Sequence, residues 1–233
     1  MVDFHTHILP GIDDGSRSVE ESLAMVQEEI RQQVDTILLT PHFYAHENSP
    51  QQFLQRRNAA WNRISEKLPQ DAPDMYLGAE VQYFEGICRI EDLELLHLGG
   101  GRILLLEMPF TRWSQRVLHD VAELQRREGT VVLLAHIERY LNFQPAAVWE
   151  DLLYQGVLMQ SNASFFLNWK TRRQALRMLQ EGKIHVLGSD CHNMSSRPPR
   201  LGEAMDWITG KADRSLKARM QAQEENMMGM IAE

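Results

Sequence analysis

The sequence has few cysteines and no long apolar run. Its 233 residues include only Cys88 and Cys191, too few for a disulfide framework or a cysteine-based zinc site. No apolar run approaches the ~18 residues of a membrane-spanning helix. The first residues, Met-Val-Asp-Phe-His, lack the basic and apolar regions of a signal peptide. We therefore expect a cytoplasmic protein that is not inserted in a membrane.

Basic residues are also scarce relative to acidic ones. Lys and Arg number 24 and Asp and Glu 32, which gives a formal charge of −8. A broad nucleic-acid footprint needs a basic face, so no nucleic-acid partner is expected. A global charge does not fix a local one, so a small anionic substrate stays open. The hydrophobic fraction of 43% and the length fit a single globular domain over residues 1–233.

Short apolar runs alternate with amphipathic stretches. Several runs, such as 103–106 and 131–134, are apolar on both faces, which is typical of parallel strands covered by helices. Seven runs in one domain favour an α/β barrel, distorted, over an open sheet. The predicted strands are 2–7, 36–42, 75–81, 102–108, 130–137, 157–162 and 185–190. The predicted helices are 18–34, 51–68, 113–128, 145–155 and 168–181, with a last helix in the tail 211–233.

Ionisable residues stand where the predicted strands end, which is where α/β barrels place their active sites. His5 and His7 are two apart on the first strand, so both imidazoles point to one face. Buried carboxylates are costly unless they are paired or bound to metal. The pattern therefore predicts a multinuclear metal site, and mixed imidazole and carboxylate ligands suit Mn²⁺, Fe or Zn²⁺. The residues that follow the later strands are His42, Glu80, Glu107, His136, Asp190 and His192.

The motifs around these residues resemble a known superfamily. His5-Thr-His7, His42, His136 and Asp190-Cys-His192 match motifs of the polymerase-and-histidinol-phosphatase (PHP) superfamily. More narrowly, the chain resembles the bacterial metal-dependent tyrosine-protein phosphatases of capsule and exopolysaccharide loci. This likeness is carried by residues 3–15, 40–42, 135–140 and 188–193, with Arg-Pro-Pro at 197–199.

The resemblance implies a distorted (β/α)₇ barrel that holds three divalent metal ions, with Mn²⁺ favoured and Fe or Zn²⁺ as alternatives. Asp14 is an added ligand on this view, although Asp-Asp-Gly at 13–15 is also typical of a turn with an Asx hydrogen bond. By position, the first metal takes His5, His7, Asp190 and a bridging Glu80, the second takes Glu80, Glu107 and His136, and the third takes Asp14, His42 and His192.

Such a site suits a phosphate monoester. Four ligand carboxylates (−4) and three divalent ions (+6) leave about +2, and the metals can bind phosphoryl oxygens and lower the pKa of a bridging water to give a hydroxide nucleophile. Arg139 and Arg197 match the family's phosphate-contacting arginines. The alternatives are a surface ion pair of Arg139 with Glu138 and an ordinary solvated loop arginine at 197.

The expected activity is hydrolysis of phosphotyrosine on a protein, the tail of a bacterial tyrosine kinase that controls capsule or exopolysaccharide synthesis. A small-molecule phosphomonoesterase such as a histidinol phosphatase, and a metal-dependent nuclease or amidohydrolase, are the enzymatic alternatives. A non-catalytic scaffold descended from such an enzyme is the third. The oligomeric state is not predicted.

Two further patterns bear on catalysis. Cys191 and Arg197 satisfy the Cys-x₅-Arg spacing of cysteine phosphatases, but a thiolate needs an electropositive, open setting and Asp190 precedes the cysteine. We expect the Cys191 side chain to turn away from the metals. Aromatic residues also follow site residues, and they either rim a pocket for an aromatic ring or pack under the loops. They are Phe43, Tyr44, Tyr140 and Phe143.

Overall fold

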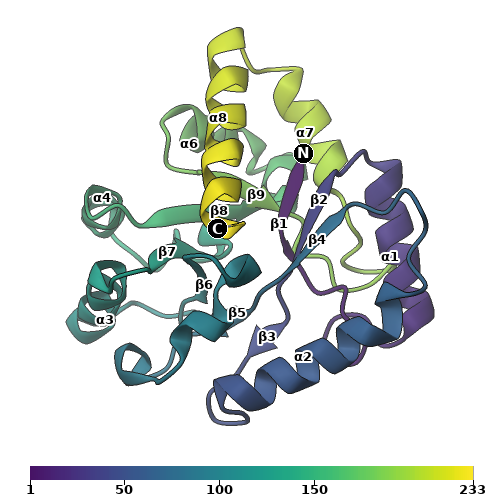
Figure 1. Ribbon diagram of the computed structural model, residues 1–233. Helices are drawn as coiled ribbons and strands as arrows, with labels where there is room; N and C mark the ends of the chain where they lie inside the picture. Colours follow the sequence, from purple (N-terminus) through teal and green to yellow (C-terminus); the bar gives the residue numbers. More distant parts are fainter. Residues whose placement is uncertain (233) are drawn as a thin grey trace.

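The computed structural model describes residues 1–232 and shows an α/β fold in which helices surround a curled parallel sheet (Figure 1). All pairings between neighbouring strands are parallel, in two ladders ordered β1-β2-β4 and β3-β5-β6-β7-β8-β9. The strands are β1 (Val2–Thr6), β2 (Thr36–Leu39), β3 (His42–Phe43), β4 (Asp74–Leu77), β5 (Glu80–Gln82), β6 (Ile103–Glu107), β7 (Val131–Leu134), β8 (Leu158–Asn162) and β9 (Val186–Gly188).

Two predicted strands are each broken in the middle. Residues 36–42 form β2 and β3, interrupted before His42 by Pro41, which has no N–H to donate to a ladder. Residues 75–81 form β4 and β5, interrupted at Gly78. Hydrogen bonds cross both interruptions, since Gly78 N donates to Leu39 O (2.9 Å) and Glu80 N donates to Pro41 O (3.0 Å). The two broken runs therefore stay side by side.

The last strand region comes back to the first. Thr6 and Cys191 form an isolated parallel bridge, and His7 N donates to Cys191 O over 2.9 Å. Asp190 N likewise donates to His5 O (2.8 Å). This contact brings the start of the chain beside residues 190–192.

Most predicted helices are present with shorter bounds. The predicted 168–181 helix begins later, and two helices, α5 and α7, were not predicted. The tail forms a helix as expected, although its last residue, 233, lies outside the described residues. The helices are α1 (Val19–Arg31), α2 (Pro50–Ser65), α3 (Gln115–Arg126), α4 (Ala146–Tyr154), α5 (Ala163–Leu167), α6 (Arg172–Gln180), α7 (Leu201–Thr209) and α8 (Arg214–Ile231). Short 3₁₀ helices span Ile87–Arg89, Leu93–Leu96, Leu98–Gly100 and Ile137–Arg139.

The sheet separates two apolar layers. On β6, Leu104 and Leu106 pack in the outer layer against the surrounding helices, whereas Ile103 and Leu105 pack in an inner cluster, as the two-residue period of a strand requires. The inner cluster also contains Ile231 of α8. A side chain at Gly101 would place its Cβ only 2.1 Å from Met230 O, so glycine here allows the close approach of the last helix.

Among the helices of residues 1–232, none combines the length and apolarity that crossing a bilayer demands.

Candidate metal centre

The carboxyl ends of the strands bring all nine predicted ligands into one cluster. His42 begins β3, Glu80 begins β5 and Glu107 ends β6. The other histidines and Asp190 lie at or just beyond strand ends, and Asp14 lies in the loop between β1 and α1. Seven of the nine side chains are buried, His42 is 10% exposed and Asp14 is 66% exposed. These groups therefore lie together in a mostly buried cluster, and Asp14 marks the side that is exposed to solvent.

The first predicted set lies within contact distance. The Nε2 atoms of His5 and His7 are 3.1 Å apart, and they lie 3.7 and 3.5 Å from Asp190 Oδ1. Glu80 Oε2 lies 3.1 Å from His5 Nε2 and 3.3 Å from His7 Nε2. His5, His7 and Asp190 form one candidate metal group, and Glu80 lies beside it.

The second predicted set is close but has an additional neighbour. His136 Nε2 lies 2.7 Å from Glu80 Oε1 and 3.6 Å from Glu107 Oε1. His42 Nδ1 lies 3.0 Å from Glu80 Oε2, so His42, Glu80 and Glu107 also form a candidate group. Glu80 consequently faces four imidazoles and is the centre of the cluster.

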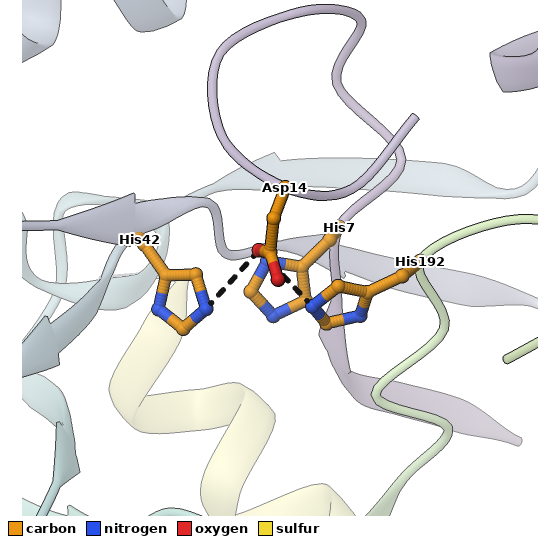
Figure 2. A group of neighbouring side chains, drawn as sticks. All are labelled: His7, Asp14, His42 and His192. Atoms are coloured by element: carbon orange, nitrogen blue, oxygen red, sulfur yellow. Dashed lines mark ion pairs between the residues drawn. The ribbon is translucent and has the colours of Figure 1, made fainter. Parts of the chain in front are cut away.

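The third predicted set gathers around Asp14 (Figure 2). Asp14 Oδ1 lies 3.5 Å from His42 Nε2 and 3.3 Å from His192 Nε2, and His7 completes the group. The alternative Asx turn does exist, but Asp13 makes it: Gly15 N donates to Asp13 Oδ1 over 2.9 Å. That turn leaves the Asp14 carboxylate pointing at the imidazoles.

Asp13 has a role that the sequence did not reveal. Its Oδ2 accepts from His7 Nδ1 (2.8 Å) and from the backbone N–H of His42 (2.9 Å). Burial opposes ionisation, but the charge and hydrogen bond of His7 outweigh it and lower the pKa of Asp13. Such a carboxylate orients an imidazole and makes its other nitrogen a better ligand. The only signal in the sequence is its place next to Asp14.

Two other buried side chains support the histidines. Gln160 Oε1 accepts from the backbone N–H of His136 (2.6 Å) and lies 3.3 Å from His5 Nδ1. The Tyr140 hydroxyl lies 3.1 Å from His136 Nδ1 and accepts from Met108 N (3.0 Å). Tyr140 is fully buried, as is Phe43, so both pack beneath the loops and neither rims the mouth.

The charges in the cluster are shaped by proximity as well as by burial. Burial disfavours ionised Glu80, but the surrounding imidazoles hold its pKa well below the usual range. Burial and the Glu80 charge raise the pKa of Glu107 to about 7. Burial, together with the charge of His7, lowers the pKa of His192 to about 4, which keeps this imidazole neutral with a lone pair to donate.

The donor atoms fit divalent cations. Three buried atoms of the cluster make no hydrogen bond to any residue that the structure describes: His42 Nδ1, Glu80 Oε2 and His192 Nε2. Buried polar atoms are rarely left without partners, and a cation would satisfy these lone pairs. The mixture of nitrogen and carboxylate oxygen matches borderline metals such as Mn²⁺, Fe and Zn²⁺.

Both predicted arginines converge on Asp190. Arg139 Nη2 donates to Asp190 Oδ2, and Arg197 Nη2 donates to Asp190 Oδ1 over 2.7 Å. Glu138 instead accepts from the Ser161 hydroxyl (3.0 Å), so the alternative surface pair with Arg139 is wrong. Each arginine is about one-third exposed, and both line a cavity of about 510 Å³.

Cys191 does not have the setting of a nucleophile. Its side chain is fully buried in the outer apolar layer. Burial, then the nearby charges of Glu29 and Asp3, raise the pKa of its thiol well above the usual range. A reactive thiolate needs the opposite conditions. The Cys-x₅-Arg alternative therefore lacks its central requirement.

Comparison with known proteins places this chain in a family. The family model "Capsular polysaccharide synthesis, CpsB/CapC" matches residues 1–231. The chain is 32% identical to the tyrosine-protein phosphatase CpsB of Streptococcus pneumoniae over 228 residues, covering 91% of this chain and 90% of that protein. It is 28% identical to the tyrosine-protein phosphatase YwqE of Bacillus subtilis over 218 residues, covering 88% of this chain and 82% of that protein.

A solved structure shares the fold. It comes from work on YwqE of Bacillus subtilis and CpsB of Streptococcus pneumoniae, described there as unique metal-dependent tyrosine phosphatases. The TM-score is 0.82 at 22% identity, and the match covers 99% of this chain and 94% of the other. The match of the family model over nearly the whole chain decides the assignment. The chain belongs to the CpsB/CapC family of capsular polysaccharide synthesis.

Proposed function

We propose that this chain is a metal-dependent phosphatase that hydrolyses phosphotyrosine on proteins. The observation that carries the proposal is the cluster of nine ionisable side chains around Glu80 with two arginines at its edge. The relatives in the same family that bear the name tyrosine-protein phosphatase support the choice of substrate.

The proposed metal complement is three divalent ions, Mn²⁺ in preference to Fe or Zn²⁺. His5, His7, Glu80 and Asp190 would hold one ion; Glu80, Glu107 and His136 a second; and Asp14, His42 and His192 a third. Bound divalent ions would supply Lewis acidity toward phosphoryl oxygens and would lower the pKa of a bound water. The imidazole orientations would be fixed by contacts with Asp13, Gln160 and Tyr140.

The two arginines orient the phosphoryl group. In the structure both guanidiniums hold the two oxygens of one carboxylate, Asp190, and a phosphate presents anionic oxygens in a similar arrangement. Arg139 and Arg197 are also exposed enough to meet a ligand from the cavity. A phenolate leaves more readily than an alkoxide, so a phosphotyrosine needs less protonation by the enzyme than a phosphoserine.

We further propose the finer details of setting and architecture. Counting the two broken runs as single strands gives seven strands, and the bridge between Thr6 and Cys191 supports closure as a distorted (β/α)₇ barrel in one domain. The proposed partner is the phosphorylated tail of a bacterial tyrosine kinase that controls capsule or exopolysaccharide synthesis, in the cytoplasm.

The test compares three substrates on one protein preparation. Mn²⁺-loaded protein is assayed against a phosphotyrosine peptide, a phosphoserine peptide of the same sequence, and histidinol phosphate. We expect the highest kcat/KM for phosphotyrosine and no turnover after chelation. Equal rates on all three substrates, or a preference for histidinol phosphate, would overturn the proposal. Chelated protein reloaded with Mn²⁺ is the control for irreversible damage.

A further inference from the structure

We propose that Phe110 forms the wall that receives the aromatic ring of the substrate and so contributes to selection of phosphotyrosine over phosphoserine. The inference rests on the proposed function and assigns a specificity-determining residue to it. Phe110 lies three residues after Glu107, in the loop that leaves β6 at the carboxyl end of the sheet. It is therefore at the same end as the metal cluster.

One side of the Phe110 ring covers the cluster. The ring lies nearly parallel to the His136 imidazole, with centroids 6.1 Å apart and 19° between planes, and 5.4 Å from the Tyr140 ring. His136 is only 1% exposed, whereas Phe110 is 46% exposed. The phenylalanine thus shields a candidate metal ligand with part of its surface and leaves the rest open to solvent.

The loop that carries Phe110 is held in place on both sides. Met108 N donates to the Tyr140 hydroxyl (3.0 Å), and the Trp113 indole N–H donates to Pro109 O (3.0 Å). Trp113 N also donates to Gln144 Oε1 (3.1 Å). The exposed ring is therefore presented on a fixed loop, and a preformed aromatic surface binds a ligand ring with little loss of entropy.

A second aromatic ring lies on another imidazole of the Glu80 cluster. Tyr44 stacks on His42, with centroids 5.2 Å apart and 20° between planes. His42 contacts Glu80 Oε2 and His136 contacts Glu80 Oε1, so the two aromatic rings lie on imidazoles that share one carboxylate. The floor between them is buried. When the phosphate of a phosphotyrosine reaches this buried floor, the tyrosine ring would lie beside Phe110. Phosphoserine has no ring to place there.

The size of the effect follows from known aromatic pairs. Offset-stacked or edge-to-face pairs contribute beyond their buried area by an amount equal to about a two- to twelvefold change in affinity. We expect Phe110→Leu, which keeps an apolar cover over His136 but removes the ring, to raise KM for the phosphotyrosine peptide about fivefold. Phe110→Tyr keeps a ring and should retain the KM of the unchanged protein.

The experiment separates ring recognition from damage to the metal cluster. For each Mn²⁺-loaded variant, KM for the phosphotyrosine peptide is measured beside the inhibition constant of inorganic phosphate and the bound metal content. Phosphate has no ring, so its inhibition constant should stay within twofold in Phe110→Leu. Tyr154→Ala is the matched control: Tyr154 is 92% exposed and ends α4, and a helix that returns between parallel strands ends at the opposite face.

Each outcome decides the inference. An increased KM with unchanged phosphate inhibition and metal content, restored in Phe110→Tyr, supports it. An unchanged KM overturns it, as does a parallel rise in the phosphate inhibition constant, which would make Phe110 a structural cover only. Failure of the proposed function itself appears separately, as the absence of a preference for phosphotyrosine in the unchanged protein.

Discussion

Two buried glutamates, Glu80 and Glu29, have different neighbours and opposite pKa shifts. Glu80 is 1% exposed and Glu29 is 0% exposed. Imidazoles surround Glu80, and they hold its pKa well below the usual range against the effect of burial. Glu29 of α1 faces another carboxyl, Asp3 of β1, and burial followed by the Asp3 charge raises the pKa of Glu29 well above the usual range.

The difference teaches that neighbours, rather than depth, decide the charge of a buried acid. Within residues 1–232 neither oxygen of Glu29 meets a hydrogen-bond donor, and Asp3 Oδ2 meets none. The Asp3–Glu29 pair therefore needs a shared proton, because two adjacent carboxylates repel. Glu80 is held ionised and offers lone pairs, so its cluster is suited to cations; the Asp3–Glu29 pair is not.

The two regions are joined through the backbone of β1. Asp3 Oδ1 accepts from His5 N (3.1 Å) and from Ser189 N (2.8 Å). The pair thereby ties α1 to the strand that carries His5 and to the segment before Asp190. Its role is in the fold, whereas the Glu80 cluster carries the chemistry.

The largest expected effect is at Glu80. Glu80→Gln keeps the shape but removes the charge that faces four imidazoles, so we expect turnover of the phosphotyrosine peptide and bound metal to fall together. Loss of an outer partner of a metal ligand already costs about 10–100-fold, and the loss here should be at least about a hundredfold. His136→Ala should behave alike.

The matched control for that substitution lies in the other region. Glu29→Gln removes a buried carboxyl of the same kind and should leave turnover within about twofold. Kinetics with metal analysis of both variants measure the difference. Retained turnover in Glu80→Gln or His136→Ala, with metal content unchanged, would contradict the ligand assignment.

The next effect concerns the arginines that contact the Glu80 cluster through Asp190. Arg197→Lys keeps the charge but loses the planar fork, and hydrogen bonds to charged groups are worth about 1.5–3 kcal/mol. We expect kcat/KM for phosphotyrosine to fall about tenfold or more, and likewise for Arg139→Lys. Arg200→Lys is the control, since Arg200 lines the same cavity but pairs with Glu203 (2.7 Å). Equal losses in all three variants would refute a specific phosphate role.

The Asp3–Glu29 pair should be visible in the pH dependence of stability. A raised acid pKa means that the folded chain holds a proton that the unfolded chain releases, so the free energy of unfolding falls as pH rises above the ordinary glutamate value of 4.5. The slope is about 1.4 kcal/mol per pH unit for one proton. Glu29→Gln should flatten this slope. The measurement is the free energy of unfolding of metal-free protein, obtained from denaturant titrations between about pH 5 and pH 8. An identical slope in both proteins would show that no proton is shared.

The smallest effect is expected at Cys191, whose thiol lies beside the Asp3–Glu29 pair. Cys191→Ser should keep phosphatase turnover within about twofold, while a chelator abolishes turnover in both proteins. Circular dichroism checks that the variant folds. The reverse pair of results, loss of activity in folded Cys191→Ser and resistance to chelation, would favour a cysteine nucleophile.

Much of this organisation was predictable from local patterns. Apolar runs predicted the strands, and the ionisable residues at their ends identified eight members of the Glu80 cluster, because parallel strands bring their carboxyl ends together. The ninth, Asp14, was predicted only from the family resemblance. The breaks before His42 and at Gly78 were not predicted, since the apolar runs continue through them. Helix α5 was missed because it has only five residues and follows β8 directly, with no turn residue between them.

What the sequence did not reveal depends on contacts between distant segments. The Asp3–Glu29 pair requires β1 and α1 to meet, and Gln160 is an ordinary strand residue until its amide reaches His136. Phe110 was missed because no site residue precedes it directly. Its proposed role depends on the contact of its ring with His136, which is distant in the sequence. Side chains whose role depends on contacts between distant segments produce no periodic pattern in the sequence.

The most direct test is a metal titration of the Glu80 cluster. Metal-free protein is reloaded with increasing Mn²⁺, and bound metal per chain, from native mass spectrometry, is recorded beside phosphotyrosine turnover in the same samples. The predicted result is no turnover without metal, activity that grows with loading, and saturation at three ions per chain. Full turnover by metal-free protein would contradict the assignment of this cluster as the catalytic metal centre.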